Sequence, residues 1–401
     1  MSVMISIGQA RELVLAAVNP LEAESVSLGE ALGRVLARDV VATGDVPPFP
    51  NSAMDGYAVL SGPAGRTLKV VGESRAGTPT TATLRDGEAI RISTGAVLPS
   101  GATAVIPQEN VGTEADRAIT TRADVADGDN VRQPGEDMAA GTIVLPAGTR
   151  LGPVALGAAV SAGAAEVTAA RRPRVAVLCT GDELRAPGEP LAPGQIHNSN
   201  APMLAGLALH AGAVVASTER LPDDRAATES GVRAALARAD VVIISGGVSV
   251  GPHDHVKPVL ASLGVGEVFW GVALQPGKPT WFGTAPDGTL VFALPGNPVS
   301  TVVTFSLFAA PALAALQGGP PPSPPCPQAA LAVPVARRAG REQAVRVRLE
   351  HRDGRVWAQP TGAQGSHILS SLLRADALAM IPAGDGALPA GGTVSLEALA
   401  G

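Results

Sequence analysis

Residues 174–183 read RVAVLCTGDE and residues 241–247 read VVIISGG. Each segment is a short run of Val, Leu or Ile that ends in a glycine-bearing loop, a pattern typical of a buried strand in a parallel sheet. The spacing predicts helices over 201–210 (capped by Asn200), 224–237, 255–263 and 299–315, and strands over 213–218, 268–272 and 290–294. Because strands that alternate with helices indicate βαβ units, we expect a doubly wound, mostly parallel α/β sheet covered by helices on both faces.

The segments on either side of this unit have a different texture. Residues 318–327 read GGPPPSPPCP, six prolines in ten residues, which is too stiff and too poor in N–H donors for a helix or strand. Short apolar runs in polar loops follow it and predict a compact β-barrel or sandwich. Upstream, apolar spacing predicts two short helices within 7–37, Val- and Ile-rich runs predict a β-rich part over 40–145, and residues 153–163 predict another helix.

We therefore expect a multidomain α/β protein in which a β-rich part is inserted between helical pieces. The predicted division is an N-terminal helical domain (1–45 plus 141–172), an inserted β-rich domain (46–140), the α/β domain (173–318), a proline-rich linker (319–327) and a C-terminal β-barrel domain (328–401). Each unit except the linker is long enough to bury apolar surface of its own.

Composition and charge exclude several classes of protein. Aromatic residues make up only 2% of the 401 residues and the net charge is -6, so a nucleic-acid partner, which requires stacking rings and a basic surface, is disfavoured. Mean hydropathy is +0.23, but no apolar stretch reaches the ~20 residues of a membrane span without interruption. The first residues also lack the pattern of a secretory signal. These features predict a cytoplasmic protein, with Cys179 and Cys326 as structural thiols.

Ligands of open α/β sheets bind outside the carboxyl ends of the strands, where four glycine-bearing loops are predicted here. Their backbone N–H groups and hydroxyls can surround a phosphate or another oxyanion. The candidate binding residues are Thr180, Gly181, Ser245, Gly246, Gly247, Ser249, Pro295, Gly296 and Asn297, with Pro276-Gly277-Lys278-Pro279 as the remaining loop. Acids in or beside these loops (Glu183, Asp223, Asp254) and in the β-rich part (Asp55, Glu109, Asp137) favour Mg²⁺ as a cofactor.

Two large enzyme classes are disfavoured by motifs that the chain lacks. The loop after the first predicted strand is not the G-x-G-x-x-G of dinucleotide-binding oxidoreductases. The phosphate-binding motif of P-loop NTPases does not occur either.

Ordered motifs along nearly the whole chain resemble the molybdopterin molybdenumtransferase family, which is related to the C-terminal domain of gephyrin. They are PPFPNSAMDGYA (47–58), STGA (93–96), VIPQE (105–109), GED (135–137), the α/β loops above and GAQGSH (362–367). The resemblance implies a protomer with helical, β-rich, molybdopterin-binding α/β and C-terminal β-barrel parts. It also implies a homodimer, in which Asp55 and Asp137 would meet the α/β loops across the subunit interface.

The activity implied by the resemblance is the conversion of adenylylated molybdopterin and molybdate, with Mg²⁺, to molybdenum cofactor and AMP. The implied catalytic residues are Asp55, Asp137, Glu183, Asp254 and Lys278, with Mg²⁺ held among Glu183, Asp254 and Asp55. Thr94 and Asp223 join the substrate-binding set, and Lys278, Arg346 and Ser366 would bind the molybdate dianion. Where several members carry basic residues this chain has Gly271 and Gln275, so more of the anion binding is expected of Arg346.

Two alternatives remain open. A molybdopterin adenylyltransferase is a stand-alone relative of the α/β domain, and the additional helical, β-rich and barrel parts favour the molybdenum-inserting enzyme over it. A gephyrin-like scaffold would not need acids in glycine-rich loops. The implied partners are a molybdopterin adenylyltransferase and the apoproteins of molybdoenzymes.

Overall fold

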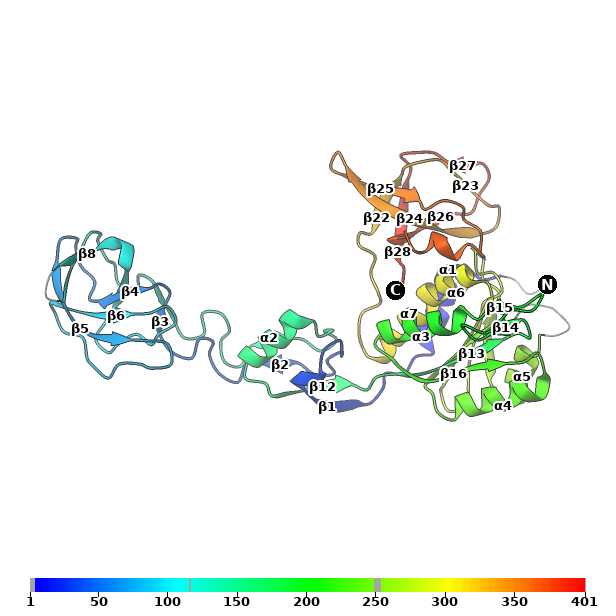
Figure 1. Cartoon of the computed structure of the whole chain (residues 1–401), viewed down its shortest axis with the longest axis horizontal. Helices are drawn as coiled ribbons and strands as arrows, with labels where there is room; N and C mark the ends of the chain where they lie inside the picture. The colour runs from blue at the N-terminus through cyan, green and yellow to red at the C-terminus, as the bar shows by residue number, and fades with distance from the viewer. Residues whose placement is uncertain (1–3, 115–116, 249–253, 401) are drawn as a thin grey trace.

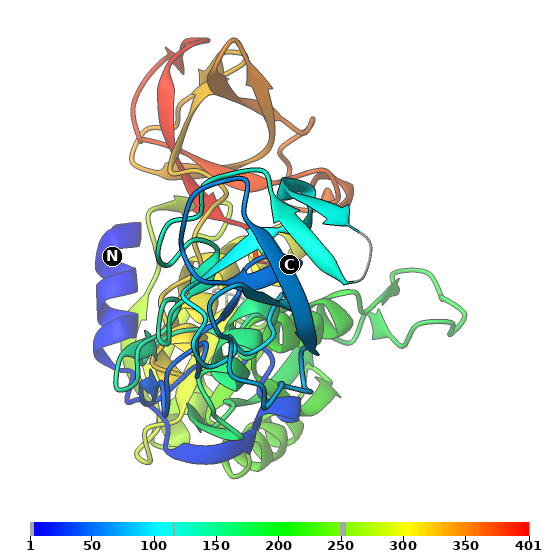
Figure 2. The ribbon, with the colours of Figure 1, turned by 90° about the vertical axis from the view of Figure 1, so that its left-hand side faces the viewer.

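The computed structural model describes residues 4–114, 117–248 and 254–400. The chain is elongated: a β-rich lobe lies at one end, a small lobe containing α2 follows, and the α/β unit and the C-terminal β domain form the other end (Figure 1). Viewed along the long axis, the C-terminal domain lies above the α/β unit (Figure 2).

The α/β unit is built on a six-stranded sheet with the order β16-β13-β17-β21-β20-β18. Its strands are β13 (Arg174–Thr180), β16 (Val214–Leu221), β17 (Val241–Ser245), β18 (Gly266–Trp270), β20 (Trp281–Thr284) and β21 (Leu290–Leu294). The first four in spatial order are parallel, whereas β20 and β18 each run antiparallel to the preceding neighbour. Every residue of β17 and β21 is buried, as expected for strands covered on both faces. The predicted mostly parallel sheet is confirmed, and β20 is a strand that the sequence pattern did not predict.

Helices cover both faces of this sheet. One face packs against α1 (Ile7–Ala16), α3 (Asn200–His210) and a continuous helix made of α6 (Pro298–Thr304), the π turn η3 (Phe305–Ala309) and α7 (Ala310–Leu316). The other packs against α4 (Arg225–Leu236) and α5 (Val256–Ser262). Within the described residues, Pro298–Leu316 is the one helix long and apolar enough to cross a membrane, and 94% of its apolar window is buried, so it is a core helix.

The small lobe was predicted to be a helical domain, but it consists mainly of short strand pairs with one helix. It contains β1 (Ala23–Ser27) paired with β12 (Glu166–Ala170), β2 (Val40–Val41) paired with β11 (Ile143–Leu145), the short turn η1 (Leu28–Glu30) and helix α2 (Pro153–Ser161). The second predicted helix within 7–37 does not form, because Gly29 and Gly33 weaken a helix there and Gly33 adopts φ +75°. The first one, α1, packs on the α/β unit through Ile7, Ala10 and Val14.

The β-rich lobe is a six-stranded sheet with the order β7-β4-β6-β5-β9-β8, which forms a near-closed barrel. Its elements are β3 (Asn51–Ser52), β4 (Gly56–Val59), β5 (Thr67–Ser74), β6 (Glu88–Ile92), β7 (Ala104–Pro107), η2 (Gln108–Asn110), β8 (Val111–Glu114), β9 (Ala118–Thr121) and β10 (Val131–Arg132), with β10 pairing β3. Two apolar clusters fill the lobe, so it buries a core of its own.

The C-terminal domain is a closed five-stranded barrel rather than a sandwich. The ring runs β24-β25-β22-β28-β26 and closes through a β24–β26 pairing, and β19 of the α/β unit adds to the edge of β24. Its elements are β19 (Leu274–Gln275), β22 (Gln328–Leu331), β23 (Val335–Ala336), β24 (Glu342–Arg352), β25 (Arg355–Pro360), η4 (Leu369–Ser371), β26 (Ala377–Ile381), β27 (Ala387–Leu388) and β28 (Thr393–Ala398).

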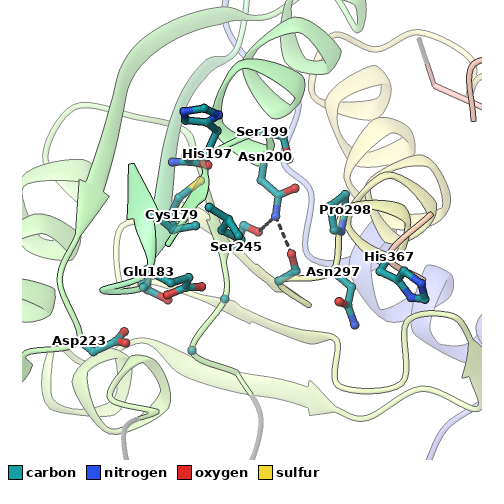
Figure 3. A pocket seen from close by; sticks show the side chains of 18 of the residues that line it. Cys179, Glu183, His197, Ser199, Asn200, Asp223, Ser245, Asn297, Pro298 and His367 are labelled. Atoms are coloured by element: carbon teal, nitrogen blue, oxygen red, sulfur yellow. Dashed lines mark hydrogen bonds between the residues drawn. The ribbon is translucent and has the colours of Figure 1, made fainter. Parts of the chain in front are cut away.

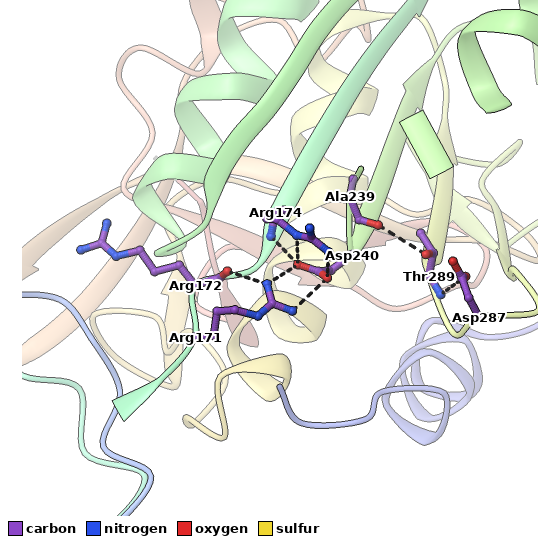
Figure 4. A network of polar contacts seen from close by, with 7 residues as sticks. All are labelled: Arg171, Arg172, Arg174, Ala239, Asp240, Asp287 and Thr289. Atoms are coloured by element: carbon purple, nitrogen blue, oxygen red, sulfur yellow. Dashed lines mark hydrogen bonds and ion pairs between the residues drawn. The ribbon is translucent and has the colours of Figure 1, made fainter. Parts of the chain in front are cut away.

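A polar network anchors the small lobe to the α/β unit (Figure 4). Arg171, in the connection that leaves the lobe, donates to both carboxylate oxygens of Asp240 at 2.8 and 3.0 Å. The backbone N–H and the guanidinium of Arg174, at the start of β13, donate to the same carboxylate. Burial alone would raise the pKa of Asp240, but these hydrogen bonds hold it well below its usual range.

Candidate active site

A cavity of about 600 Å³ lies outside the carboxyl ends of the parallel strands (Figure 3). It is lined by the loops after β13, β16, β17 and β21, by the first residues of α3 and by one loop of the C-terminal domain. The lining residues are Cys179, Thr180, Gly181, Glu183, Leu184, Ile196, His197, Asn198, Ser199, Asn200, Asp223, Ser245, Gly246, Gly247, Asp254, Gly296, Asn297, Pro298 and His367. The strand ends therefore bring most of the predicted glycine-loop residues together.

Glycine is required at the centre of this cavity for steric reasons. Gly246 adopts φ +95°, and a Cβ there would lie 2.7 Å from Thr180 Oγ1 and 2.9 Å from the Thr180 carbonyl oxygen. A Cβ at Gly181 would lie 2.3 Å from a carboxylate oxygen of Glu183. The loops after β13 and β17 can pack this closely only without side chains, which leaves their backbone exposed to a ligand.

Asn200 joins two of these loops. Its Nδ2 donates to Ser245 Oγ and to the carbonyl oxygen of Gly296, each at 2.8 Å (Figure 3). The prediction that Asn200 caps the helix is wrong: Ser199 is the cap residue of α3, and the backbone N–H of Ala201 is satisfied by Asn198 Oδ1 at 3.1 Å. Asn200 thus fixes the β17 and β21 loops relative to each other.

Three predicted acids line the cavity: Glu183, Asp223 and Asp254. Asp223 also joins two loops. Its carboxylate accepts from the backbone N–H of Asp182 at 3.3 Å, and the Asp182 carboxylate accepts from the backbone N–H of Asp223 at 3.2 Å. The described part of the chain contains no group of three or more metal-ligating side chains. An ion that binds here would therefore need oxygen atoms from a ligand in addition to the protein carboxylates.

The thiol of Cys179 lies beneath the cavity at the end of β13. Burial raises its pKa to about 11, although a hydrogen bond with the Asn198 side chain lowers it in part. Because the thiolate is the nucleophilic form, Cys179 is unreactive near neutral pH. This agrees with its interpretation as a structural thiol.

The predicted residues of the β-rich part lie elsewhere. The Asp55 carboxylate accepts two hydrogen bonds from Thr94. The backbone N–H of Thr94 donates at 2.8 Å and its hydroxyl Oγ1 donates at 3.1 Å. Asp137 lies at the base of the same lobe, where its backbone N–H donates to the Val46 carbonyl oxygen. Figure 1 places this lobe at the opposite end of the chain from β13 and β16, so these acids and the cavity do not meet within one chain.

The remaining predicted residues contribute no side chain to the cavity lining. Lys278 is exposed, beyond β21 at the same edge of the sheet. Pro295 is buried, and its carbonyl oxygen accepts from Thr301 Oγ1 at 2.7 Å. The carbonyl oxygen of Ser366 accepts from the backbone N–H of Val299 at the start of α6. Ser249 falls outside the described residues.

Arg346 is not placed to bind a free anion. Only 1% of it is exposed, and its guanidinium donates to Ser371 Oγ at 3.1 Å and to the Gly365 carbonyl oxygen at 3.2 Å. Burial lowers its pKa to about 10, which leaves it charged at neutral pH. The structure therefore corrects the expectation for Arg346: the side chain holds the loop over residues 362–367 instead of reaching the cavity.

Two histidines and two asparagines line the cavity without having been selected from the sequence as site residues: His197, His367, Asn198 and Asn200. His367 belongs to the motif at 362–367, which was visible, but only the docking of this loop on α6 shows that the C-terminal domain reaches the cavity. His197 is engaged with the Glu189 carbonyl oxygen at 3.0 Å.

Comparison with known families and relatives gives a consistent result over the chain. Three family models match: the MoeA N-terminal region (domain I and II) over residues 5–163, a probable molybdopterin binding domain over 176–315, and the MoeA C-terminal region (domain IV) over 328–399. The chain is 39% identical to a molybdopterin molybdenumtransferase of Haemophilus influenzae, with 98% of both chains covered. It is likewise 39% identical to the molybdopterin molybdenumtransferase 2 of Mycobacterium tuberculosis, over 94% of this chain and 96% of that one.

A solved structure is similar over the same extent. The crystal structure of the molybdopterin biosynthesis moeA protein from Pyrococcus horikoshii OT3 superposes with a TM-score of 0.83 at 31% sequence identity, covering 99% of this chain and 100% of that chain. The similarity therefore includes the elongated β-rich lobe and the C-terminal barrel as well as the α/β unit.

Proposed function

Because the chain belongs to the MoeA family and is a molybdopterin molybdenumtransferase of molybdenum-cofactor synthesis, we propose that it inserts molybdate into adenylylated molybdopterin and releases AMP. Replacement of one molybdate oxygen by the two thiols of the pterin dithiolene releases one water. Hydrolysis of the phosphoanhydride consumes one water. The products are then molybdenum cofactor and AMP.

The observation that carries this proposal is the cavity at the carboxyl ends of β13, β17 and β21. Its volume of about 600 Å³ is within the range of sites for a molecule of this size. Gly247 has a positive φ, and together with Gly296 it presents backbone at which phosphate oxygens can approach N–H groups, whereas the N–H of Gly246 already donates to the Leu294 carbonyl oxygen at 3.1 Å. The N-termini of α3 and of the helix that begins with α6 add positive potential at the same place.

Mg²⁺ fits the carboxylates that line this cavity. Glu183 and Asp254 supply the one or two protein carboxylates that Mg²⁺ takes beside substrate phosphates, and the absence of a larger ligand cluster among the described residues suits an ion that arrives with its substrate. Bound there, Mg²⁺ would neutralise charge on the phosphates as the anhydride is cleaved. Asp223 orients the loop of Glu183 through its contact with Asp182. Asn200 keeps the two phosphate-facing loops at a fixed separation.

We further propose a homodimer in which Asp55 and Asp137 of one subunit face the cavity of the other. These acids lie in a lobe that extends away from the cavity of their own chain (Figure 1), so a second subunit is the route by which they would reach it. The bond from Thr94 to Asp55 would hold that carboxylate toward the neighbour's substrate. A cytoplasmic location, a molybdopterin adenylyltransferase as the source of substrate and apo-molybdoenzymes as acceptors complete the proposal.

The test is AMP release from adenylylated molybdopterin with and without molybdate and Mg²⁺, followed by activation of an apo-molybdoenzyme. We expect release that depends on both ions, and Glu183→Gln should reduce it at least about 100-fold, because loss of a charged metal ligand is worth several kcal/mol. Glu12→Gln, on the exposed side of α1, is the matched control and should act like the wild type. Tight binding without turnover would instead support a scaffold, and formation of adenylylated molybdopterin from ATP would support an adenylyltransferase.

A further inference from the structure

The charge of the cavity lining does not match the charge of its proposed ligands. Adenylylated molybdopterin and molybdate are both anionic, yet the described lining residues include the carboxylates Glu183, Asp223 and Asp254 and no lysine or arginine. Mg²⁺ would offset part of this charge, and helix N-termini another part. The side chains in the described lining that can carry a positive charge are His197 and His367.

These two histidines differ in their surroundings. The Nε2 of His197 lies 3.0 Å from the Glu189 carbonyl oxygen, so that nitrogen is already engaged. Among the described residues, no hydrogen-bond partner is seen for the ring of His367, which is exposed beside Asn297 and Pro298 at the edge of the cavity (Figure 3). Its ring is thus available to a ligand.

His367 is held in place from two domains. The Nδ1–Cε1 edge of its ring packs over Gly365, where a Cβ would lie 3.0 Å from Cε1. Arg346, on the outer face of β24, binds the Gly365 carbonyl oxygen, and Gln364 exchanges hydrogen bonds with the backbone of Arg346 at 2.9 and 3.2 Å. On the other side, the Ser366 carbonyl oxygen accepts from Val299 at 3.1 Å. A buried, charged arginine is thus used to support a loop whose exposed residue faces the cavity.

We propose that His367 is a further substrate-binding residue, which donates a hydrogen bond to an oxyanion of the substrates, and that Arg346 is its positioning residue. The oxyanion is molybdate or a phosphate of adenylylated molybdopterin, two ligands of the same chemistry. This inference rests on the proposed function. It assigns to the C-terminal domain a direct contact with the ligand bound at the α/β unit.

The test measures the two substrates separately. For His367→Ala we expect KM for molybdate or for adenylylated molybdopterin to rise about tenfold or more, as for loss of one charge-assisted hydrogen bond, with kcat changed by less than about threefold. His367→Arg, which retains a donor and a positive charge, should recover most of the loss. His351→Gln, on the exposed end of β24, is the matched control and should leave both constants unchanged.

Arg346→Lys tests the positioning role. Lysine keeps the charge but lacks the planar guanidinium that binds Ser371 and Gly365 together. The substrate whose KM rises in His367→Ala should therefore also show a raised KM in Arg346→Lys. The double variant should be no worse than His367→Ala alone, which a merely structural role would not predict.

Unchanged KM values for both substrates in His367→Ala would overturn the proposal, whatever Arg346→Lys does. Retention of sodium molybdate and of adenylylated molybdopterin in ultrafiltration provides a readout that does not need turnover. If the wild type releases no AMP, the proposed function fails. Weaker retention by His367→Ala than by the wild type would still support the contact, and equal retention would still overturn it.

Discussion

The absence of a side chain at Gly246 allows the loops after β13 and β17 to pack against each other. We expect Gly246→Ala to lower AMP release at least about tenfold, because the added methyl group overlaps Thr180 Oγ1 and the Thr180 carbonyl oxygen and separates the loops after β13 and β17. Gly264→Ala is the control, since Gly264 also has a positive φ (+79°) but a Cβ there meets only Pro286 Cγ, at 3.5 Å. The positive φ alone should cost each variant about 1 kcal/mol of stability, and Gly246→Ala should lose more, because its methyl group also overlaps Thr180.

Circular dichroism and urea unfolding would measure the stability lost by each variant, and kinetics would measure the difference in AMP release. Equal activities of Gly246→Ala and Gly264→Ala would show that the close approach to Thr180 has no role in the reaction.

The site residues that the sequence predicted and those it missed differ in a physical respect. Thr180, Ser245 and Gly246 follow directly from strand ends, so a strand pattern is enough to bring them together. Asn200 and His367 depend on how a helix start and a distant loop dock, which no local pattern contains. Arg346 was selected for its charge, but its burial decides its role. The sequence did not indicate this burial, because other arginines lie close to Arg346 along the chain.

At the scale of elements, the central strands were predicted because they are uniformly apolar. The β17 and β21 segments are buried at every position. By contrast, β1 has only Val26 buried and pairs with β12, more than a hundred residues away, so its strand conformation depends on a contact distant in sequence. The strand β20 was missed because it is short and follows directly on a Pro-Gly-Lys-Pro turn.

The network around Asp240 (Figure 4) gives a prediction about the junction of two such elements, the connection at Arg171 and the start of β13. Asp240→Asn should reduce the free energy of unfolding at pH 7 by about 1–2 kcal/mol, a value discounted because both arginines are partly exposed. The folded-state pKa of Asp240 is lowered, so its contribution is present above the unfolded pKa of about 3.9 and is lost as pH falls toward the folded value.

Urea unfolding of both proteins from pH 7 to pH 3 measures this. The difference between wild type and Asp240→Asn should be constant down to about pH 5 and shrink below about pH 4. Asp287→Asn is the control, because Asp287 is exposed and, within the described residues, accepts only the backbone N–H of Thr289 at 3.0 Å. A difference that does not change with pH would mean that the carboxylate charge is not what anchors the lobe.

At the scale of the whole molecule, the order of the parts was readable because composition changes at their boundaries: apolar strand–helix alternation, then a proline-rich run, then short strands in polar loops. The elongated shape was not readable from these patterns, because the lobe is joined by two connections whose direction depends on packing around Arg171 and Asp240. This shape has a functional consequence. It separates Asp137 from the cavity of its own chain, and so makes the dimer a testable requirement for activity.

If each active site combines the cavity of one subunit with the lobe of the other, two inactive variants should complement each other. In a heterodimer of Asp137→Ala and Asp254→Ala chains, one site carries both substitutions and the other carries neither, so an equal mixture after full subunit exchange should recover about a quarter of wild-type AMP release, by the symmetry of a two-fold dimer. Glu183→Ala mixed with Asp254→Ala is the control, because both residues line the same cavity and every site then stays defective. Subunit exchange, followed with differently tagged chains, must be complete in both mixtures. Recovery in the first mixture only would establish the shared site, whereas no recovery in either would mean that Asp137 acts within its own chain or only supports the lobe.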